Sequence, residues 1–206
     1  MKKIPDWFPV AGIALFCILY VIATLMYPGG SAAEPDAIGF SWQHNFWCTL
    51  MQAKAINGQI NPARPFALAS MFDLWVTVAV FLHLFAKKHA TGHFSEHIIR
   101  YGGVIASTTA CFIFTPWHDQ ATIIASGVAT VVFVVVIRSA ITRLKRVQLT
   151  FGALSLVVVI GNNIIYYTGW HMGALPVIQK ISFISVFAWM LVVHQEWVKK
   201  PKISEG

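Results

Sequence analysis

The chain has 206 residues, of which 57% are hydrophobic and only 11% are charged, and its mean hydropathy is +0.65. A soluble domain of this size could not cover so much apolar surface, so the composition predicts a polytopic membrane protein. The formal net charge of +7 does not indicate nucleic-acid binding. The basic residues flank apolar stretches, where anionic lipid headgroups are the natural partner. We therefore expect membrane lipids, and no nucleic acid, as partners.

Six apolar stretches follow one another along the chain, each of about 17–23 residues, the length that crosses a hydrocarbon core of about 30 Å as a helix. They cover residues 7–27, 66–86, 98–117, 121–137, 148–170 and 175–197. The sequence thus predicts an all-α fold, in which residues 1–206 form a single integral membrane domain with six transmembrane helices. The basic start followed by Ser31-Ala32-Ala33 resembles a signal peptide. However, the first stretch is longer than an h-region of about 7–15 residues, so we expect a retained helix.

Lysine and arginine gather at the N-terminus, after every second apolar stretch and at the C-terminus. These residues are Lys2, Lys3, Lys87, Lys88, Arg100, Arg138, Arg143, Lys145, Arg146, Lys199, Lys200 and Lys202. The opposite side carries only Lys54 and Arg64. By the positive-inside rule, both termini face the cytoplasm of a multi-pass protein in the cell membrane, meaning a plasma or inner membrane.

The first outer loop, residues 28–65, is the longest segment outside the predicted spans, and long loops are usually functional or disordered. It contains the turn signals Pro28-Gly29-Gly30, Asn57-Gly58 and Asn61-Pro62. The aromatic residues within 40–55 argue against disorder. We expect an interfacial or re-entrant helix in that part, and a structured loop that caps the outer mouth of the helix bundle.

Polar side chains inside apolar stretches are costly, so their positions are the best indication of function. A rise of 1.5 Å per residue places a set of them about 8–12 Å below the outer helix ends. These are Asp73, Asn162, Asn163, Gln179 and Lys180. We expect Asp73 and Lys180 to pair, because an isolated carboxylate at that depth is unfavourable. With Asn45 of the loop, these residues form a candidate ligand pocket. Alternatively, Lys180 snorkels to the headgroups and the two asparagines only join helices.

A second candidate site lies above that layer, in the outer connections, and consists of His44, His118, Asp119 and His171. Three imidazoles and a carboxylate suit zinc, and an open coordination position on the metal would activate water for hydrolysis. Without a metal, His118 and Asp119 could act as a catalytic acid–base pair. The competing interpretation is that histidine populates membrane interfaces because it is amphipathic.

Three histidines on the cytoplasmic side, His89, His93 and His97, are spaced at i, i+4 and i+8. On one helix they would share a face, and histidine pairs at this spacing can ligate a metal. Gly92 weakens such a helix, and the neighbouring lysines oppose a cation. A solvated loop face is the favoured interpretation.

The stretch from Tyr27 to Arg64 reads YPGGSAAEPDAIGFSWQHNFWCTLMQAKAINGQINPAR, and residues 115–119 read TPWHD. These blocks resemble an uncharacterised family of bacterial and archaeal six-helix membrane proteins, distantly akin to the eukaryotic DRAM-type membrane proteins. The resemblance implies a six-helix fold without an established activity. Family members often carry a histidine in the fourth helix, whereas residues 121–137 contain none.

The leading functional hypothesis is that the outer-leaflet polar pocket binds or moves a lipid or other amphiphile. One alternative is a membrane-embedded lipid hydrolase that acts with zinc or through the acid–base pair. Another is a structural or partner-binding membrane subunit. The substrate and the oligomeric state stay open at this level.

Overall fold

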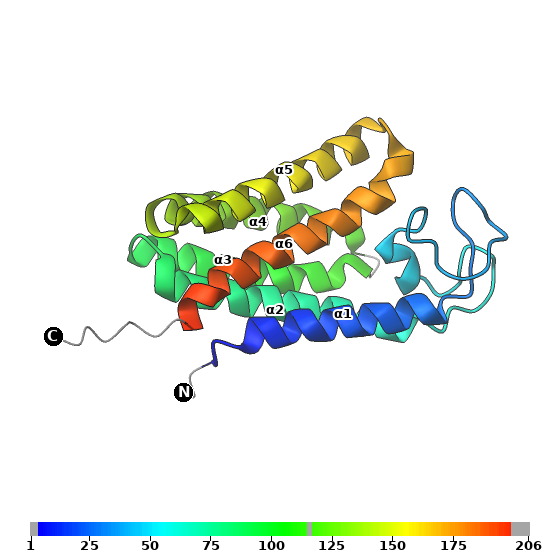
Figure 1. Ribbon diagram of the computed structural model, residues 1–206, viewed down its shortest axis with the longest axis horizontal. Helices are drawn as coiled ribbons and strands as arrows, with labels where there is room; N and C mark the ends of the chain where they lie inside the picture. The colour runs from blue at the N-terminus through cyan, green and yellow to red at the C-terminus, as the bar shows by residue number, and fades with distance from the viewer. Residues whose placement is uncertain (1–3, 115–116, 199–206) are drawn as a thin grey trace. The chain divides into compact units, whose positions relative to one another are not determined.

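The computed structural model describes residues 4–114 and 117–198, without the side chains at positions 113, 114, 118, 119 and 122. Within that part the chain is all-α, with six α-helices, three short 3-10 helices and no β-strand (Figure 1). The α-helices are α1 (Phe8–Met26), α2 (Arg64–His89), α3 (His93–Ala110), α4 (His118–Arg143), α5 (Arg146–Thr168) and α6 (Leu175–Val198). The 3-10 helices are η1 (Trp47–Met51), η2 (Cys111–Phe114) and η3 (Met172–Ala174).

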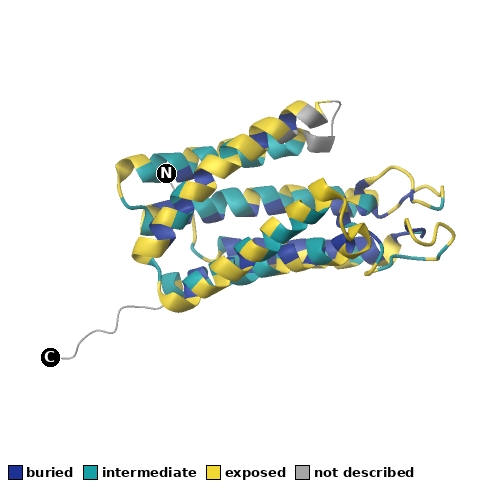
Figure 2. Cartoon of the chain, turned by 90° about the horizontal axis from the view of Figure 1, so that it is seen from above, coloured by how far each residue is buried: buried dark blue, intermediate teal, exposed yellow. Residues whose placement is uncertain are grey.

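Five helical segments in the described part are long and apolar enough to cross a membrane, namely Phe8–Met26, Arg64–His89, Ile123–Arg143, Arg146–Thr168 and Met172–Val198. They match five of the six predicted stretches, although α4 continues past the predicted end at residue 137. α3 does not join them, because its first two turns carry His93, Glu96, His97 and Arg100. Large apolar side chains such as Leu25, Ile123 and Val157 are exposed along these helices (Figure 2). Lipid would cover them, as in a multi-pass membrane protein.

The chain divides into two compact units. The first unit combines residues 1–11, 75–151 and 188–206, and the second combines residues 12–74 and 152–187. The units are not consecutive halves of the sequence, since α1, α2, α5 and α6 contribute residues to both. The second unit contains the loop between α1 and α2 together with all six residues of the predicted ligand pocket.

Glycines allow close helix packing in the first unit. A Cβ atom at Gly102 of α3 would overlap the side chain of Val132 on α4. A Cβ atom at Gly103 would lie 2.8 Å from Cδ1 of Leu82 on α2. Small residues at helix contacts are typical of membrane proteins, because backbones can then approach closely.

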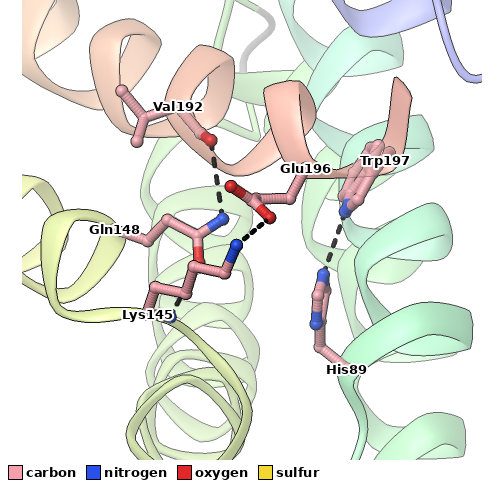
Figure 3. Close-up of polar contacts among 6 residues, drawn as sticks. All are labelled: His89, Lys145, Gln148, Val192, Glu196 and Trp197. Carbon is pink, nitrogen blue, oxygen red and sulfur yellow. Dashed lines mark hydrogen bonds and ion pairs between the residues drawn. The ribbon is translucent and has the colours of Figure 1, made fainter. Parts of the chain in front are cut away.

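Polar contacts link three helices at another place in the first unit (Figure 3). The indole Nε1 of Trp197 on α6 donates a hydrogen bond of 2.9 Å to Nε2 of His89 at the end of α2. Lys145, just before α5, forms an ion pair of 2.6 Å with Glu196 of α6. Gln148 of α5 donates a longer hydrogen bond to a backbone carbonyl of α6. The C-terminal turns of α6 are thereby tied to the end of α2 and to the start of α5.

The loop between α1 and α2 is ordered, but the helix expected over residues 40–55 is not formed. Only η1 is helical there, and the rest is a series of turns. The reason is local, because Asn45 Oδ1 accepts a hydrogen bond of 2.8 Å from the Ser41 backbone N–H. Asparagine side chains that bond to nearby backbone groups compete with helix formation in this way.

Two sets of contacts hold distant parts of this loop against each other. Gly30 has a φ of +85°, and a Cβ atom there would lie 2.5 Å from the Asn57 backbone nitrogen. Nearby, Asn61 Nδ2 donates hydrogen bonds of 2.9 Å to the carbonyls of Leu50 and Gln52. The loop is therefore held by buried polar contacts and by close backbone packing that only glycine permits.

Candidate functional site

The loop between α1 and α2 is anchored by a buried lysine of α6. Lys180 is only 6% exposed. Its ammonium donates hydrogen bonds of 2.6 Å to the Asn45 carbonyl and 2.9 Å to the Pro176 carbonyl. It also lies over the ring of Phe40, 5.6 Å from the ring centroid. Buried cations need such partners, since an ammonium without hydrogen bonds or a counter-charge is costly in an apolar environment.

The acceptor of this bond is itself fixed in place. Asn45 is fully buried, and its Nδ2 donates a hydrogen bond of 2.8 Å to the Gly30 carbonyl. Tyr27 Oη donates a weaker bond of 3.4 Å to the same carbonyl. Asn45 therefore joins the glycine turn at the start of the loop to the lysine of α6.

The neighbouring residue of α6 provides a second anchor. Gln179 Oε1 accepts a hydrogen bond of 3.0 Å from the backbone N–H of Trp47. The Trp47 ring packs against Phe16, Tyr20 and Phe183, with centroid distances of 5.5, 4.4 and 4.9 Å. Aromatic pairs at such distances contribute beyond their buried area, so the loop is held by both polar and aromatic contacts.

A groove lies beside these anchors, between the loop and the segment that begins α6. Its volume is about 330 Å³, and its lining residues are Ala32, Ala33, His44, Phe46, Met172, Gly173 and Pro176. We call it the loop groove. Among the described residues that line it, His44 alone is titratable, and His44 Nδ1 lies 3.4 Å from Ser41 Oγ. The arrangement presents an apolar surface with one polar group that can hydrogen-bond to a ligand.

A second groove, in the first unit, is more open. Its volume is about 380 Å³, and it runs between α3 and α4, where it is lined by His97, Ile98, Tyr101, Gly102, Val128, Val131 and Val132. The groove is open, and its lining is almost entirely apolar.

The structure brings together three of the six residues predicted for the ligand pocket, namely Asn45, Gln179 and Lys180. The expected ion pair between Asp73 and Lys180 is absent from the described part of the chain. The Lys180 ammonium reaches backbone carbonyls instead, and Asp73 Oδ2 is buried without a hydrogen-bond partner among the described residues. That prediction was wrong, because the Lys180 ammonium is bonded to two backbone carbonyl oxygens and not to the Asp73 carboxylate.

The two asparagines of α5 do not join this cluster through any hydrogen bond in the described residues. Asn163 is exposed, and its Nδ2 donates a bond of 2.8 Å to the Val159 carbonyl of its own helix. Asn162 Oδ1 is buried and has no hydrogen-bond partner among the described residues.

The structure describes the side chains of only two of the four residues predicted for the zinc site. His44 lines the loop groove, whereas His171 is exposed, has a φ of +53° and packs its ring against Trp170. The side chains of His118 and Asp119 lie outside the described residues. Among the residues that are described, no three histidine, cysteine or acidic side chains gather into a possible metal site. Zinc binding and the acid–base pair therefore stay predictions.

Cys48 of η1 lies next to the anchor residue Trp47, and its thiol is expected to be unreactive. Although part of the residue is exposed, burial of the thiol raises the pKa of Cys48, and backbone hydrogen bonds together with the Lys180 charge only partly oppose this shift. A thiol with a raised pKa stays protonated at neutral pH and is a poor nucleophile.

Sequence reasoning missed the residues that shape the loop groove. Asn61 was interpreted only as part of a turn, although its buried amide holds two carbonyls of η1 and its flank. Ala32 and Ala33 carry no chemical signal at all. Met172 lies in η3 and Pro176 in the first turn of α6, and neither residue type by itself indicates a groove.

Compared with protein-family models, curated proteins and solved structures, the chain shows no match. The family resemblance indicated by the sequence therefore stays a prediction, and functional argument must proceed from the geometry.

Proposed function

We propose that this multi-pass membrane protein binds a lipid or another amphiphile in the loop groove. The observation that carries the proposal is the groove itself, which is lined by apolar side chains and one imidazole. In this proposal all six helices belong to the membrane domain, both termini lie in the cytoplasm, and the loop between α1 and α2 faces outward. The distribution of lysine and arginine supports that orientation.

The size and lining of the loop groove favour part of an amphiphile over a whole phospholipid. Small-molecule sites usually enclose about 300–1,000 Å³, and this groove, at about 330 Å³, is at the lower end. Phe46, Met172 and Pro176 provide an apolar wall for a chain, while His44 can hydrogen-bond to a headgroup. Methionine is suited to such walls because its flexible side chain adapts to irregular ligands.

The anchored loop supports the same proposal. The groove has one wall on the loop and the other on η3 and the start of α6, and Lys180 and Gln179 bind the loop to α6 close by. Lys180 therefore acts in this proposal by holding the wall in place, since at 6% exposure it is not accessible to a ligand.

The test uses a photoreactive single-chain lysophospholipid that does not cross membranes, added to the outside of intact cells. We expect cross-links in peptides that contain residues 32–46 and 172–176. Ala33→Phe should reduce this labelling severalfold, because its ring fills the groove. Ala53→Phe is the matched control, since Ala53 is an exposed alanine of the same loop outside the groove.

Equal labelling of both variants and the original protein would contradict binding in the groove. Labelling of the same peptides in inverted vesicles but not in intact cells would contradict the proposed orientation. It would still support binding in the loop groove. Labelling confined to the exposed faces of the helices would favour a structural subunit that only contacts bulk lipid.

A further inference from the structure

The first unit contains a pair of histidines that the proposed function does not use. His89, His93 and His97 would share a face only if one helix carried all three, but His89 ends α2 and Gly92 precedes α3. His93 and His97 remain together in the first turns of α3. Their Nε2 atoms face each other at 2.8 Å. We propose that this pair chelates one divalent transition-metal ion of the Cu²⁺ or Ni²⁺ class.

The separation of the two nitrogen atoms is suited to chelation. Bonds from a metal to histidine nitrogen are about 2.0–2.1 Å long, so two nitrogens at this separation subtend an angle of about 86° at the metal. An angle near 90° is that of adjacent positions in square-planar or octahedral coordination, whereas a tetrahedral zinc site requires a wider one. Tetragonal coordination by nitrogen and oxygen ligands is typical of Cu²⁺ and Ni²⁺.

Without a metal, the two nitrogens must share one proton, because two unprotonated nitrogens would repel each other at this distance. A metal ion would displace that proton and lie to one side of the line joining the two nitrogens, and the rings would turn on the same helix face so that both lone pairs point at the metal. The His97 ring is already held, since it stacks on Tyr101 with a centroid distance of 5.4 Å and an interplanar angle of 8°. The His93 ring stands nearly perpendicular to it, at 84°.

Charges around the pair are only partly compensated, because Lys87 has no ion-pair partner among the described residues. The positive end of the α3 dipole works against a cation, and Glu96 in the same turn offsets it. Arg100 lies 3.8 Å from the Glu96 carboxylate. Lys88 forms an ion pair of 3.0 Å with Asp6. With no third protein ligand gathered there among the described residues, water would occupy the other coordination positions.

The test is titration of the full-length detergent-purified protein, without an affinity His tag, with NiCl₂ by calorimetry. A parallel sample with one equivalent of Cu²⁺ is measured by electron paramagnetic resonance. We expect one metal ion per chain and a copper spectrum with coupling to two imidazole nitrogens. Since loss of even an outer-shell partner weakens metal sites about 10- to 100-fold, His93→Ala and His97→Ala should each weaken Ni²⁺ binding at least about tenfold.

His194→Ala is the matched control, because His194 lies on α6 and belongs to neither the proposed pair nor the predicted zinc site. Its removal should leave the stoichiometry and the copper spectrum unchanged. Equal loss in the control, or no loss in the two α3 variants, would overturn the site. Half an equivalent of metal per chain would also overturn it, because two copies would then share one ion. The peptide-labelling experiment on the loop groove does not depend on any of these results.

Discussion

Replacing Lys180 by methionine should loosen the loop between α1 and α2 without unfolding the protein. Lys180→Met keeps the length and the apolar stem of the side chain but removes the hydrogen bond to the Asn45 carbonyl. A hydrogen bond to a charged group is worth about 1.5–3 kcal/mol. The second bond, to the Pro176 carbonyl, lies within α6 and does not tie the loop.

The global free energy of unfolding should change far less than this. Burying an ammonium costs several kcal/mol after relaxation, and methionine removes that cost together with the bond. The loss of the hydrogen bond should therefore change the equilibrium for local opening of the loop more than the global free energy of unfolding. At about 1.4 kcal/mol per tenfold change, the opening equilibrium should rise about 10- to 150-fold.

The assay is hydrogen–deuterium exchange followed by mass spectrometry on the protein in lipid nanodiscs. Peptides that cover residues 41–51 should exchange faster by that factor, because the Trp47 N–H and the Asn45 N–H are bonded there. Lys54→Met is the matched control, since Lys54 is an exposed lysine of the same loop. Unchanged exchange in Lys180→Met, or an equal change in Lys54→Met, would refute the reasoning. Uniformly faster exchange in every peptide would also refute it, because the lysine would then support the whole fold.

Two glycine pairs give further predictions. Gly30→Ala should lower the thermal midpoint of the protein in nanodiscs. The steric overlap of the added Cβ should destabilise the fold by about 1–3 kcal/mol, in addition to the cost of the positive φ. Gly58→Ala is its control, because Gly58 has nearly the same φ but nothing within 4 Å of an added Cβ; equal shifts would show that crowding at Gly30 is unimportant. Gly102→Ala should likewise lower the midpoint through overlap with Val132, whereas Gly127→Ala on α4 meets no neighbour within 4 Å. A Gly102→Ala protein as stable as Gly127→Ala would contradict close packing of α3 on α4.

The helices were predictable because their length and apolar content are imposed by the membrane. The sequence placed Gln179 and Lys180 in one candidate pocket, and both are bonded to the loop in the structure; their depth in a membrane stays a prediction. The direction of each side chain around its helix was not readable, and the predicted pair of Asp73 and Lys180 was wrong for that reason. Depth alone does not distinguish a carboxylate partner from a loop carbonyl such as that of Asn45.

The loop groove could not be predicted from the sequence, and the reason differs from that for the ion pair. Its shape follows from the path of the chain through Gly30 and from the amides of Asn45 and Asn61, which fix backbone carbonyls. These contacts replace the helix that the aromatic content of residues 40–55 suggested. Alanines such as Ala33 line the resulting groove, and an alanine in a sequence does not by itself indicate a binding surface.

The two anchors of the loop are consecutive residues of one helix, and this makes them sensitive to rotation. Neighbouring side chains on an α-helix point about 100° apart, so Gln179 and Lys180 reach Trp47 and Asn45 together at only one angular setting of α6. Turning the helix about its axis by a few tens of degrees would strain both hydrogen bonds in the same motion. The position of the loop is thus coupled to the rotation of the start of α6. A molecule bound against Pro176 would shift the loop by turning the helix.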